Sequence, residues 1–220
     1  MNLSKGLDQY LLVDERFLNE EVLLLDLSCN DVVLEIGPGT GNLTRKLAER
    51  ARVIAIEKDE RFSLHLNIPN VELIFADALK IDFDALEFNK FASNIPYSVS
   101  REIILKLLRT EFDRGVIVCQ DEFARKLVAR PRDKNYRAIS VIAQYYADLE
   151  LHSKVPRTAF RPVPDVDSRI VSFVKKRARN IDFENFVKSA FSQRRKIFWK
   201  GKRPGEMSVE EFEDAFSFGK

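Results

Sequence analysis

The chain has 220 residues, of which 45% are hydrophobic, so it can bury the core of one main domain with an appendage. The 36 Lys and Arg residues against 34 Asp and Glu give a net charge of +2, which does not by itself indicate a nucleic-acid partner. Two cysteines, Cys29 and Cys119, exclude a disulfide framework and have no metal-ligand spacing, and no apolar run approaches the roughly 18 residues of a membrane span. We therefore expect a cytoplasmic protein with no membrane segment and no metal.

The first 120 residues alternate between two hydrophobic patterns. Asp14 is placed to cap a helix that runs to about residue 26. Short apolar runs then predict strands, and helical spacing separates them. The expected strands are residues 32–36, 53–57, 71–75, 90–93 and 115–119, with helices at residues 42–50, 59–66 and 102–109. This alternation predicts an α/β protein with a parallel sheet covered on both faces.

The pattern changes after the fifth strand. The expected elements are helices at residues 122–130 and 137–146 and strands at residues 149–155 and 169–175. Prolines separate the two strands, which fits an antiparallel pair at one edge of the sheet. The tail predicts helices, the last starting at a capping box of Ser208 and Glu211. We expect a main domain over residues 1–178 and a reduced helical region over residues 179–220.

Three glycines, Gly37, Gly39 and Gly41, follow the first strand and lead into a helix. Glycine has no Cβ, so the backbone of such a turn can pass close to a ligand. The dinucleotide fingerprint needs a further glycine where Asn42 stands, so the turn favours a nucleoside without a pyrophosphate. We predict S-adenosylmethionine rather than NAD. A glycine cluster alone is more often an ordinary turn.

Two carboxylates close the next two strands. Glu57 ends the second strand, where it can accept hydrogen bonds from both hydroxyls of a ribose. Asp77 follows the third strand, where it can accept one from an adenine amino group. In open parallel sheets ligands lie at the carboxyl ends of the strands, so both are expected beside the glycine turn. Acidic residues at strand ends are common, so the prediction depends on the combined order and spacing.

The segment from Asn94 to Tyr97 follows the fourth strand and should open onto the same crevice. An exocyclic amine of a nucleobase is weakly nucleophilic because its lone pair is delocalised into the ring. The Asn94 side-chain oxygen and the Ile95 carbonyl could accept its N–H groups and localise that lone pair. Pro96 restricts Ile95 to an extended conformation, and Tyr97 offers a face for the base. Positioning and electrostatics can then carry methyl transfer without a general base. As a free-standing string, this tetrapeptide is more often a turn.

Charge is uneven along the chain. Residues 171–205 carry eleven basic and two acidic residues, a net charge of +9. Within this segment Arg194, Arg195 and Lys196 are predicted to contact RNA phosphates, on or just after a helix that contains Phe191, Phe198 and Trp199. The alternatives are a solvated face, or ion pairs through which this segment docks on the main domain.

Seven segments together match a known family. They are residues 9–14 (QYLLVD), 34–41 (LEIGPGTG), 56–57 (IE), 77–79 (DAL), 94–97 (NIPY), 159–168 (AFRPVPDVDS) and 191–196 (FSQRRK). The chain resembles the ribosomal-RNA adenine dimethyltransferases, which dimethylate the 6-amino groups of two adjacent adenosines in small-subunit rRNA, and the related macrolide-resistance rRNA methyltransferases. The similarity covers residues 5–196 and is closest to the archaeal and eukaryotic branch.

The resemblance implies a Rossmann-like S-adenosylmethionine-dependent methyltransferase domain. It adds Gln9, Tyr10, Leu12 and Glu35 to the cofactor site and makes Phe160 a second stacking wall beside the target base. The resemblance also assigns Glu57, Asp77, Asn94 and Tyr97 the roles proposed above. The chain departs from the family at Asp8, where glycine is usual, and in its helical C-terminal region, which is shorter.

We therefore predict a monomeric enzyme that dimethylates adenosines of small-subunit rRNA, in free form or in a ribosomal precursor particle. A ribosome-assembly factor that keeps the fold without turnover is the main alternative. A DNA amine methyltransferase shares a similar tetrapeptide but should lack the segments at residues 160–168 and 193–196. An NAD oxidoreductase is the most distant alternative.

Overall fold

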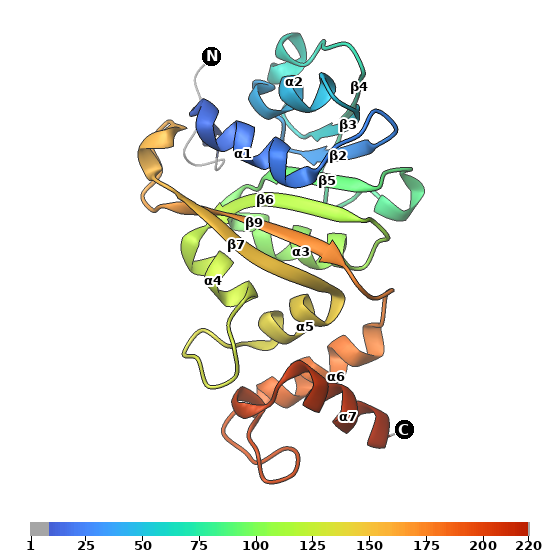
Figure 1. The fold of residues 1–220 in the computed structure, drawn as a ribbon, viewed down its shortest axis with the longest axis vertical. Coiled ribbons are helices and arrows are strands. Elements are labelled where there is room, and N and C mark those ends of the chain that lie inside the picture. Colours follow the sequence, from blue (N-terminus) through green and yellow to red (C-terminus); the bar gives the residue numbers. More distant parts are fainter. Residues whose placement is uncertain (1–8, 220) are drawn as a thin grey trace.

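The computed structural model describes residues 9–219 and is built on a sheet of seven strands, in the order β4-β3-β2-β5-β6-β9-β7 (Figure 1). These strands are β2 (Val32–Ile36), β3 (Arg52–Glu57), β4 (Val71–Phe75), β5 (Lys90–Asn94), β6 (Arg114–Gln120), β7 (Ala147–Val155) and β9 (Ser168–Lys175). A second sheet pairs β1 (Leu11–Leu12) with β8 (Phe160–Arg161) in antiparallel register.

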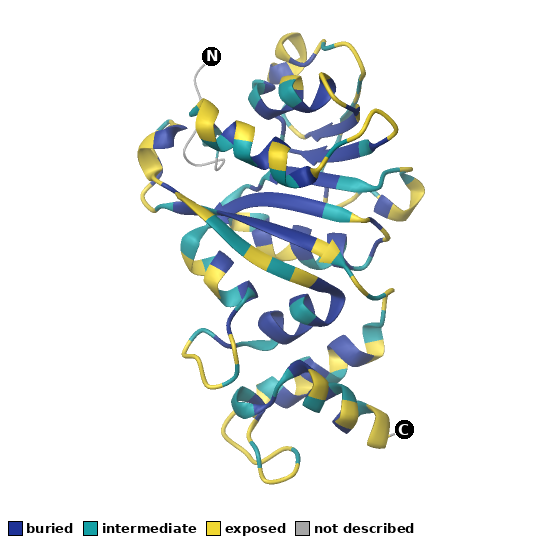
Figure 2. Ribbon diagram, viewed as in Figure 1, coloured by how far each residue is buried: buried dark blue, intermediate teal, exposed yellow. Residues whose placement is uncertain are grey.

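Strands β2 to β6 are parallel, whereas β9 is antiparallel to both of its neighbours. Because β9 lies between β6 and β7, the antiparallel pair occupies one edge of the sheet, as predicted. The α/β class and the Rossmann-like arrangement are confirmed. The central strands β2, β3, β5, β6 and β9 are mostly buried, whereas the edge strands β4 and β7 are partly exposed (Figure 2).

Two layers of helices cover the sheet. The α-helices are α1 (Glu15–Leu25), α2 (Asn42–Ala48), α3 (Ser100–Leu108), α4 (Asp121–Leu127), α5 (Ala138–Tyr146), α6 (Ile181–Ser192) and α7 (Val209–Phe218). The Asp14 side chain caps α1 by accepting a hydrogen bond from the Arg16 N–H, as predicted. A short 3-10 helix, Glu60–His65, stands where a helix was expected over residues 59–66.

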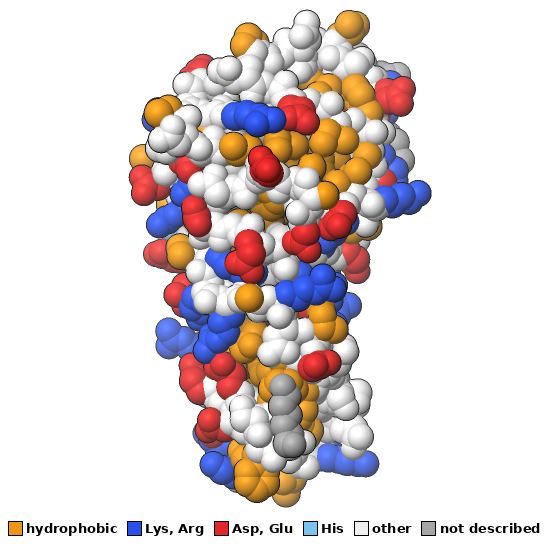
Figure 3. Space-filling view, turned by 90° about the vertical axis from the view of Figure 1, so that its right-hand side faces the viewer, with side chains coloured by type: hydrophobic (Ala, Val, Ile, Leu, Met, Phe, Trp, Pro, Cys, Tyr) orange, Lys and Arg blue, Asp and Glu red, His pale blue; other side chains and the backbone are white. Residues whose placement is uncertain are grey.

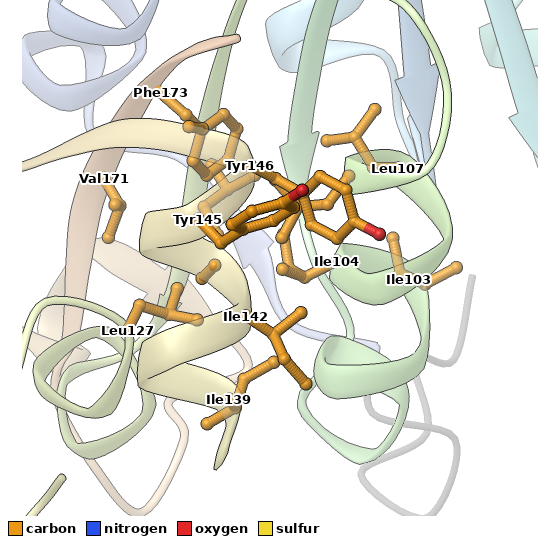
Figure 4. Close-up of a cluster of buried hydrophobic side chains, with 14 of the residues drawn as sticks. Ile103, Ile104, Leu107, Leu127, Ile139, Ile142, Tyr145, Tyr146, Val171 and Phe173 are labelled. Carbon is orange, nitrogen blue, oxygen red and sulfur yellow. The ribbon is translucent and has the colours of Figure 1, made fainter. Parts of the chain in front are cut away.

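Alternation along each strand divides the core into two clusters. In β3, Val53 and Ala55 pack with α1 and α2, whereas Ile54 and Ile56 pack with the cluster of α3, α4 and α5. Figure 4 shows the second cluster, in which side chains of α5 lie between α3 and the strand β9. Burial on both faces explains why the central strands are apolar runs rather than alternating ones.

The C-terminal helices extend the second cluster. Phe183 of α6 stacks on Tyr145 of α5 with ring centroids 4.0 Å apart, and Phe212 of α7 belongs to the same core. Arg109, the C-cap residue of α3, forms an ion pair of 2.7 Å with Glu184 of α6, whose side chain is fully buried. The helical region is therefore continuous with the main core, and the boundary at residue 178 stays a prediction.

One helix prediction is wrong. Helix α6 ends at Ser192, and Phe198 and Trp199 lie in a turn segment rather than on a helix. Lys200 and Gly201 adopt positive φ angles of 44° and 77°, which reverse the chain. Downstream, α7 begins at the expected capping box, in which the Ser208 N–H donates to Glu211 at 3.0 Å.

Acidic and basic side chains alternate over the middle of the face shown in Figure 3, without a patch of one sign. Between residues 9 and 219, no helix is long and apolar enough to cross a membrane.

Candidate active site

A cavity of about 790 Å³ lies at the carboxyl ends of β2, β3 and β5, beside the segment that follows β4. Its lining includes predicted site residues from five separate segments: Gln9, Tyr10, Gly37, Gly39, Glu57, Asp77, Asn94 and Pro96. The sheet topology brings these residues together because parallel strands end at one edge.

The glycine turn forms one wall. Gly37 and Gly39 have φ angles of 70° and 55°, a backbone conformation that favours glycine. A Cβ on Gly39 would lie 2.6 Å from the Leu11 side chain, so a larger residue would also displace the N-terminal segment. The Gly39 N–H donates to Glu57 Oε2 at 3.0 Å, which fixes the turn to the end of β3.

Glu57 is held firmly at the cavity. Its Oε1 accepts hydrogen bonds of 2.8 Å from the Lys58 and Asp59 N–H groups, while Oε2 accepts the one from Gly39. Burial nevertheless raises the pKa of Glu57. Each carboxylate oxygen can accept about two hydrogen bonds, so Oε2 retains one site. In this conformation one acceptor position on Oε2 is open, and the contact of Glu57 with the ribose hydroxyls stays a prediction.

Asp77 also lines the cavity. Its Oδ1 accepts from the Leu79 N–H at 3.0 Å, and its Oδ2 pairs with Lys58 at 3.0 Å. The Lys58 ammonium lowers the pKa of Asp77, so this carboxylate is ionised at neutral pH. No local pattern singles out Lys58, because its partner is 19 residues away along the chain.

The N-terminal segment crosses the cavity. Gln9 Nε2 donates to Asp59 Oδ2 at 2.6 Å, and the Val13 N–H donates to the Ala159 carbonyl at 2.9 Å. These bonds and the β1–β8 pair bring residues 9–13 beside β3 and the segment around residue 160. Asp8, the departure from the family pattern, lies outside the described residues.

Asn94 lines the cavity, and its side chain also contacts a buried glutamate, Glu21. With Nδ2 turned toward α1, the carboxamide donates to both oxygens of Glu21 at 3.2 Å, and only this orientation satisfies both ends of the amide. Glu21 is 0% exposed. Sequence reasoning missed it, although a signal exists: Glu21 stands three residues after Leu18 and four before Leu25, on the apolar face of α1.

Leu12, Glu35 and Gly41 lie outside the cavity lining, contrary to their assignment as direct contacts. Leu12 packs in the core at 2% exposure. Glu35 is equally buried, its Oε2 has no hydrogen-bond partner among the described residues, and burial raises its pKa to about 8. Their roles at the cofactor stay predictions.

The two predicted stacking residues are also outside the lining. Tyr97 stacks on Tyr10 with ring centroids 5.5 Å apart, and its hydroxyl lies 2.8 Å from Ser168 Oγ. Phe160 is 2% exposed in the core cluster of α1 and α2. No face of Phe160 is open to a base in this conformation, so its role as a stacking wall stays a prediction.

The basic residues Arg194, Arg195 and Lys196 lie in the turn after α6, at the end of the molecule away from α2 and β4 (Figure 1). All three are exposed, and none forms an ion pair within the part of the chain that the structure describes. The docking of the tail instead uses Glu184 and Glu213, which pair with Arg109 and Arg177. This arrangement argues against the docking alternative for Arg194 and Arg195.

The cavity opens at the strand ends of a Rossmann-like sheet, and its wall includes Gly37 and Gly39 of the glycine turn. Within residues 9–219, no cluster of three or more His, Cys, Asp or Glu side chains could hold a metal ion. Fold and site together are those of the Rossmann-like methyltransferases.

Comparison with known proteins narrows this class. The family model for ribosomal RNA adenine dimethylases matches residues 1–210. A probable ribosomal RNA small subunit methyltransferase A of Methanosarcina barkeri is 44% identical over 213 residues, covering 89% of this chain and 71% of the relative. The protein of the same name from Thermococcus sibiricus is 42% identical over 201 residues, covering 88% and 73%.

Solved structures agree. A dimethyladenosine transferase from Plasmodium falciparum superposes with a TM-score of 0.84 at 26% identity, covering 95% of this chain and 97% of the other. The 23S rRNA methyltransferase ErmE superposes with a TM-score of 0.70 at 26% identity, covering 94% and 98%. The chain belongs to the ribosomal RNA adenine dimethylase family, an enzyme family, which confirms the predicted enzyme class.

Proposed function

We propose that this protein methylates the 6-amino groups of adjacent adenosines in small-subunit rRNA, with S-adenosylmethionine as the methyl donor. The observation that carries the proposal is the position of Asn94 and Pro96 in the same cavity as Glu57 and Asp77. A carboxamide that can accept an amine N–H therefore borders the site suited to a nucleoside cofactor. The named relatives act on ribosomal RNA, which supports the same substrate class here.

Each part of the cavity has a distinct task. Glu57 Oε2 accepts a ribose hydroxyl, and Asp77 accepts an adenine amino group, while Gly37 and Gly39 leave room for the nucleoside. When bound, S-adenosylmethionine supplies an electrophilic methyl group. Gln9 and Tyr10 close the N-terminal side of the cavity and reduce the access of water.

The tetrapeptide prepares the nucleophile. Asn94 Oδ1 accepts one N–H of the target amine, the Ile95 carbonyl accepts the other, and the lone pair is thereby localised on nitrogen. Pro96 fixes the backbone, with φ −54° and ψ 131°, so the groups are positioned before the base arrives. The proton released on methylation leaves to water, since no described side chain is placed as its dedicated base.

The substrate assignment has a direct test. The protein is incubated with undermethylated small ribosomal subunits and isotope-labelled S-adenosylmethionine, and digested rRNA is analysed by mass spectrometry for mono- and dimethylated adenosine. Label in dimethyladenosine supports the proposal. Binding to the particles without label would favour the assembly-factor alternative, and transfer to duplex DNA but not to subunits would favour a DNA methyltransferase. The cytoplasmic location stays a prediction. The monomeric state also stays a prediction, which sedimentation analysis can test.

A further inference from the structure

A buried carboxyl group lies directly behind the side chain that the proposed function assigns to the target amine. Glu21 of α1 is 0% exposed and lies 3.2 Å, through both of its oxygens, from Asn94 Nδ2. Helix α1 packs against β5 and β6, so this contact joins the first helix to the end of β5. Burying a carboxyl group is costly unless it gains hydrogen bonds, which makes the position informative.

The contact has a directional consequence. A carboxamide has a donor end and an acceptor end. While the carboxyl group of Glu21 is ionised, both of its oxygens are acceptors, so only the donor end of the amide can bond to them. If Nδ2 is directed to Glu21, Oδ1 is directed to the opposite side, where donor groups face it. Without Glu21, nothing on this side distinguishes the two amide orientations.

We propose that Glu21 is a positioning residue that fixes the Asn94 carboxamide with its oxygen turned to the target amine. The inference rests on the proposed function, because it gives Asn94 the role of acceptor. It adds a residue on α1 that belongs to none of the seven segments through which the family resemblance was recognised.

The electrostatics around Glu21 are compatible with this role. Burial and the neighbouring Glu35 raise the pKa of Glu21 well above its ordinary range. A protonated carboxyl group still has a carbonyl oxygen that can accept from Nδ2. Its O–H can also donate to Oδ1, so only the ionised carboxylate fixes the direction of the amide. The hydrogen bond with Asn94 lowers the pKa of Glu21 and so favours this ionised form.

The main variant is Glu21→Met, which keeps an unbranched side chain of similar size and removes the acceptor. Glu21→Gln keeps an acceptor oxygen and serves as the conservative rescue. Glu20→Met makes the same change one residue earlier on α1, where the side chain is partly exposed and accepts from the Ser153 N–H. Single-turnover methylation of undermethylated small ribosomal subunits is measured at saturating cofactor.

We expect Glu21→Met to slow methyl transfer by about 10-fold or more, since interactions that align a group for the transition state act on turnover. The rates of Glu21→Gln and Glu20→Met should stay within about threefold of the rate of the unmodified protein, which is less than the effect expected from the loss of one hydrogen bond. Adding Glu21→Met to Asn94→Ala should have no further effect, because the group that Glu21 positions is then absent. Cofactor affinity should be unchanged in every Glu21 variant.

NMR spectroscopy tests the contact between Glu21 and Asn94 without a measurement of methylation. In protein labelled with ¹⁵N-asparagine, the resonance lost in Asn94→Ala identifies the Asn94 side-chain amide. Its shift should move in Glu21→Met and be retained in Glu21→Gln. If Glu21→Met does not fold, Glu21→Leu makes the same comparison.

The outcomes separate the two proposals. If Asn94→Ala methylates at the normal rate, the role of Asn94 in the proposed function fails and the inference fails with it. If Asn94→Ala is slow while Glu21→Met retains the normal rate and amide shift, the proposed function stands and Glu21 is not a positioning residue. Equal slowing by Glu21→Met in both Asn94 backgrounds would also overturn the inference, because it would show an effect independent of Asn94.

Discussion

The rings of Tyr10 and Tyr97 stack with centroids 5.5 Å apart and planes inclined by 24°. This contact links the N-terminal segment to the tetrapeptide, although the two residues are far apart in sequence. It also covers one face of Tyr97, so only the other face can receive a base. The proposed cofactor closure by Tyr10 and the proposed base recognition by Tyr97 would therefore share one aromatic pair.

The first prediction tests this face. Tyr97→Ala should slow methylation of small subunits by about 5- to 150-fold, the equivalent of the 1–3 kcal/mol of one base stacked on an aromatic ring. Tyr97→Phe removes the hydroxyl that contacts Ser168 and should remain within about threefold, since it keeps the ring. Single-turnover rates measure both; equal losses in the two variants would assign the effect to the hydroxyl.

Replacement of Glu57 by alanine should weaken S-adenosylmethionine binding by about 1–3 kcal/mol, the range for a charge-assisted hydrogen bond left unmade. The structure adds a cause, because the variant also releases the N–H groups of Gly39, Lys58 and Asp59. Glu49→Ala, on the exposed end of α2, is the control. Calorimetric titration gives the affinities, and an unchanged value would remove Glu57 from the site.

Glu35 predicts a dependence of stability on pH. Burial raises its folded-state pKa from 4.5 to about 8, so between these values the folded chain keeps a proton that the unfolded chain loses. The free energy of unfolding should therefore fall as pH rises through this window, by up to about 1.4 kcal/mol per unit. The side chain introduced by Glu35→Gln cannot ionise, so the stability of this variant relative to the unmodified protein should increase from about pH 5 to about pH 8. Denaturant unfolding of both proteins at the two pH values measures this difference. The same change in unfolding free energy with pH in both proteins would contradict a buried neutral Glu35.

The basic turn predicts salt-dependent RNA binding. Alanine at Arg194, Arg195 and Lys196 should lower affinity for small-subunit rRNA and flatten the log–log salt slope by about two or three units, at roughly 0.7–0.9 per phosphate contact. Because none of the three pairs with a described acidic group, the melting temperature should be unchanged. Lost thermal stability with an unchanged slope would instead support a docking role.

Docking of the tail should depend on Arg109. Arg109→Ala leaves the fully buried Glu184 with Lys188 and the Tyr146 hydroxyl, and should cost about 3 kcal/mol, the lower end for a broken buried ion pair. Arg177→Ala breaks the more exposed pair with Glu213 and should cost no more than about 1 kcal/mol. Urea unfolding compares the two; equal costs would show that burial of Glu184 does not matter.

The sequence predicted the parallel strands and the residues at their ends because periodicity and strand-end position are local features. Gly39, Glu57, Asp77 and Asn94 were therefore assigned to one crevice before their contacts were known. The pairing of Glu21 with Asn94 could not be predicted in this way, since it depends on how α1 crosses the sheet.

The same limit explains the less successful predictions. Phe198 and Trp199 carry a helical apolar spacing, yet the positive φ angles at Lys200 and Gly201 place them in a turn. Phe160 belongs to a recognisable motif, but β1 pairs with β8 and buries its side chain. In both cases a backbone or pairing choice made elsewhere overrides the local pattern.

Because β9 lies between β6 and β7, the newly synthesised protein can complete its sheet only after β9 has been made. All strands that end at the cavity are complete once β6 has been made, but β6 then has no partner on its outer side, because β7 joins the sheet only through β9. Until residue 175 has left the ribosome, the nascent chain exposes an open strand edge that can pair with other chains. A ribosome stalled between β7 and β9 would thus release a fragment with a nearly complete cofactor pocket and a strong tendency to aggregate.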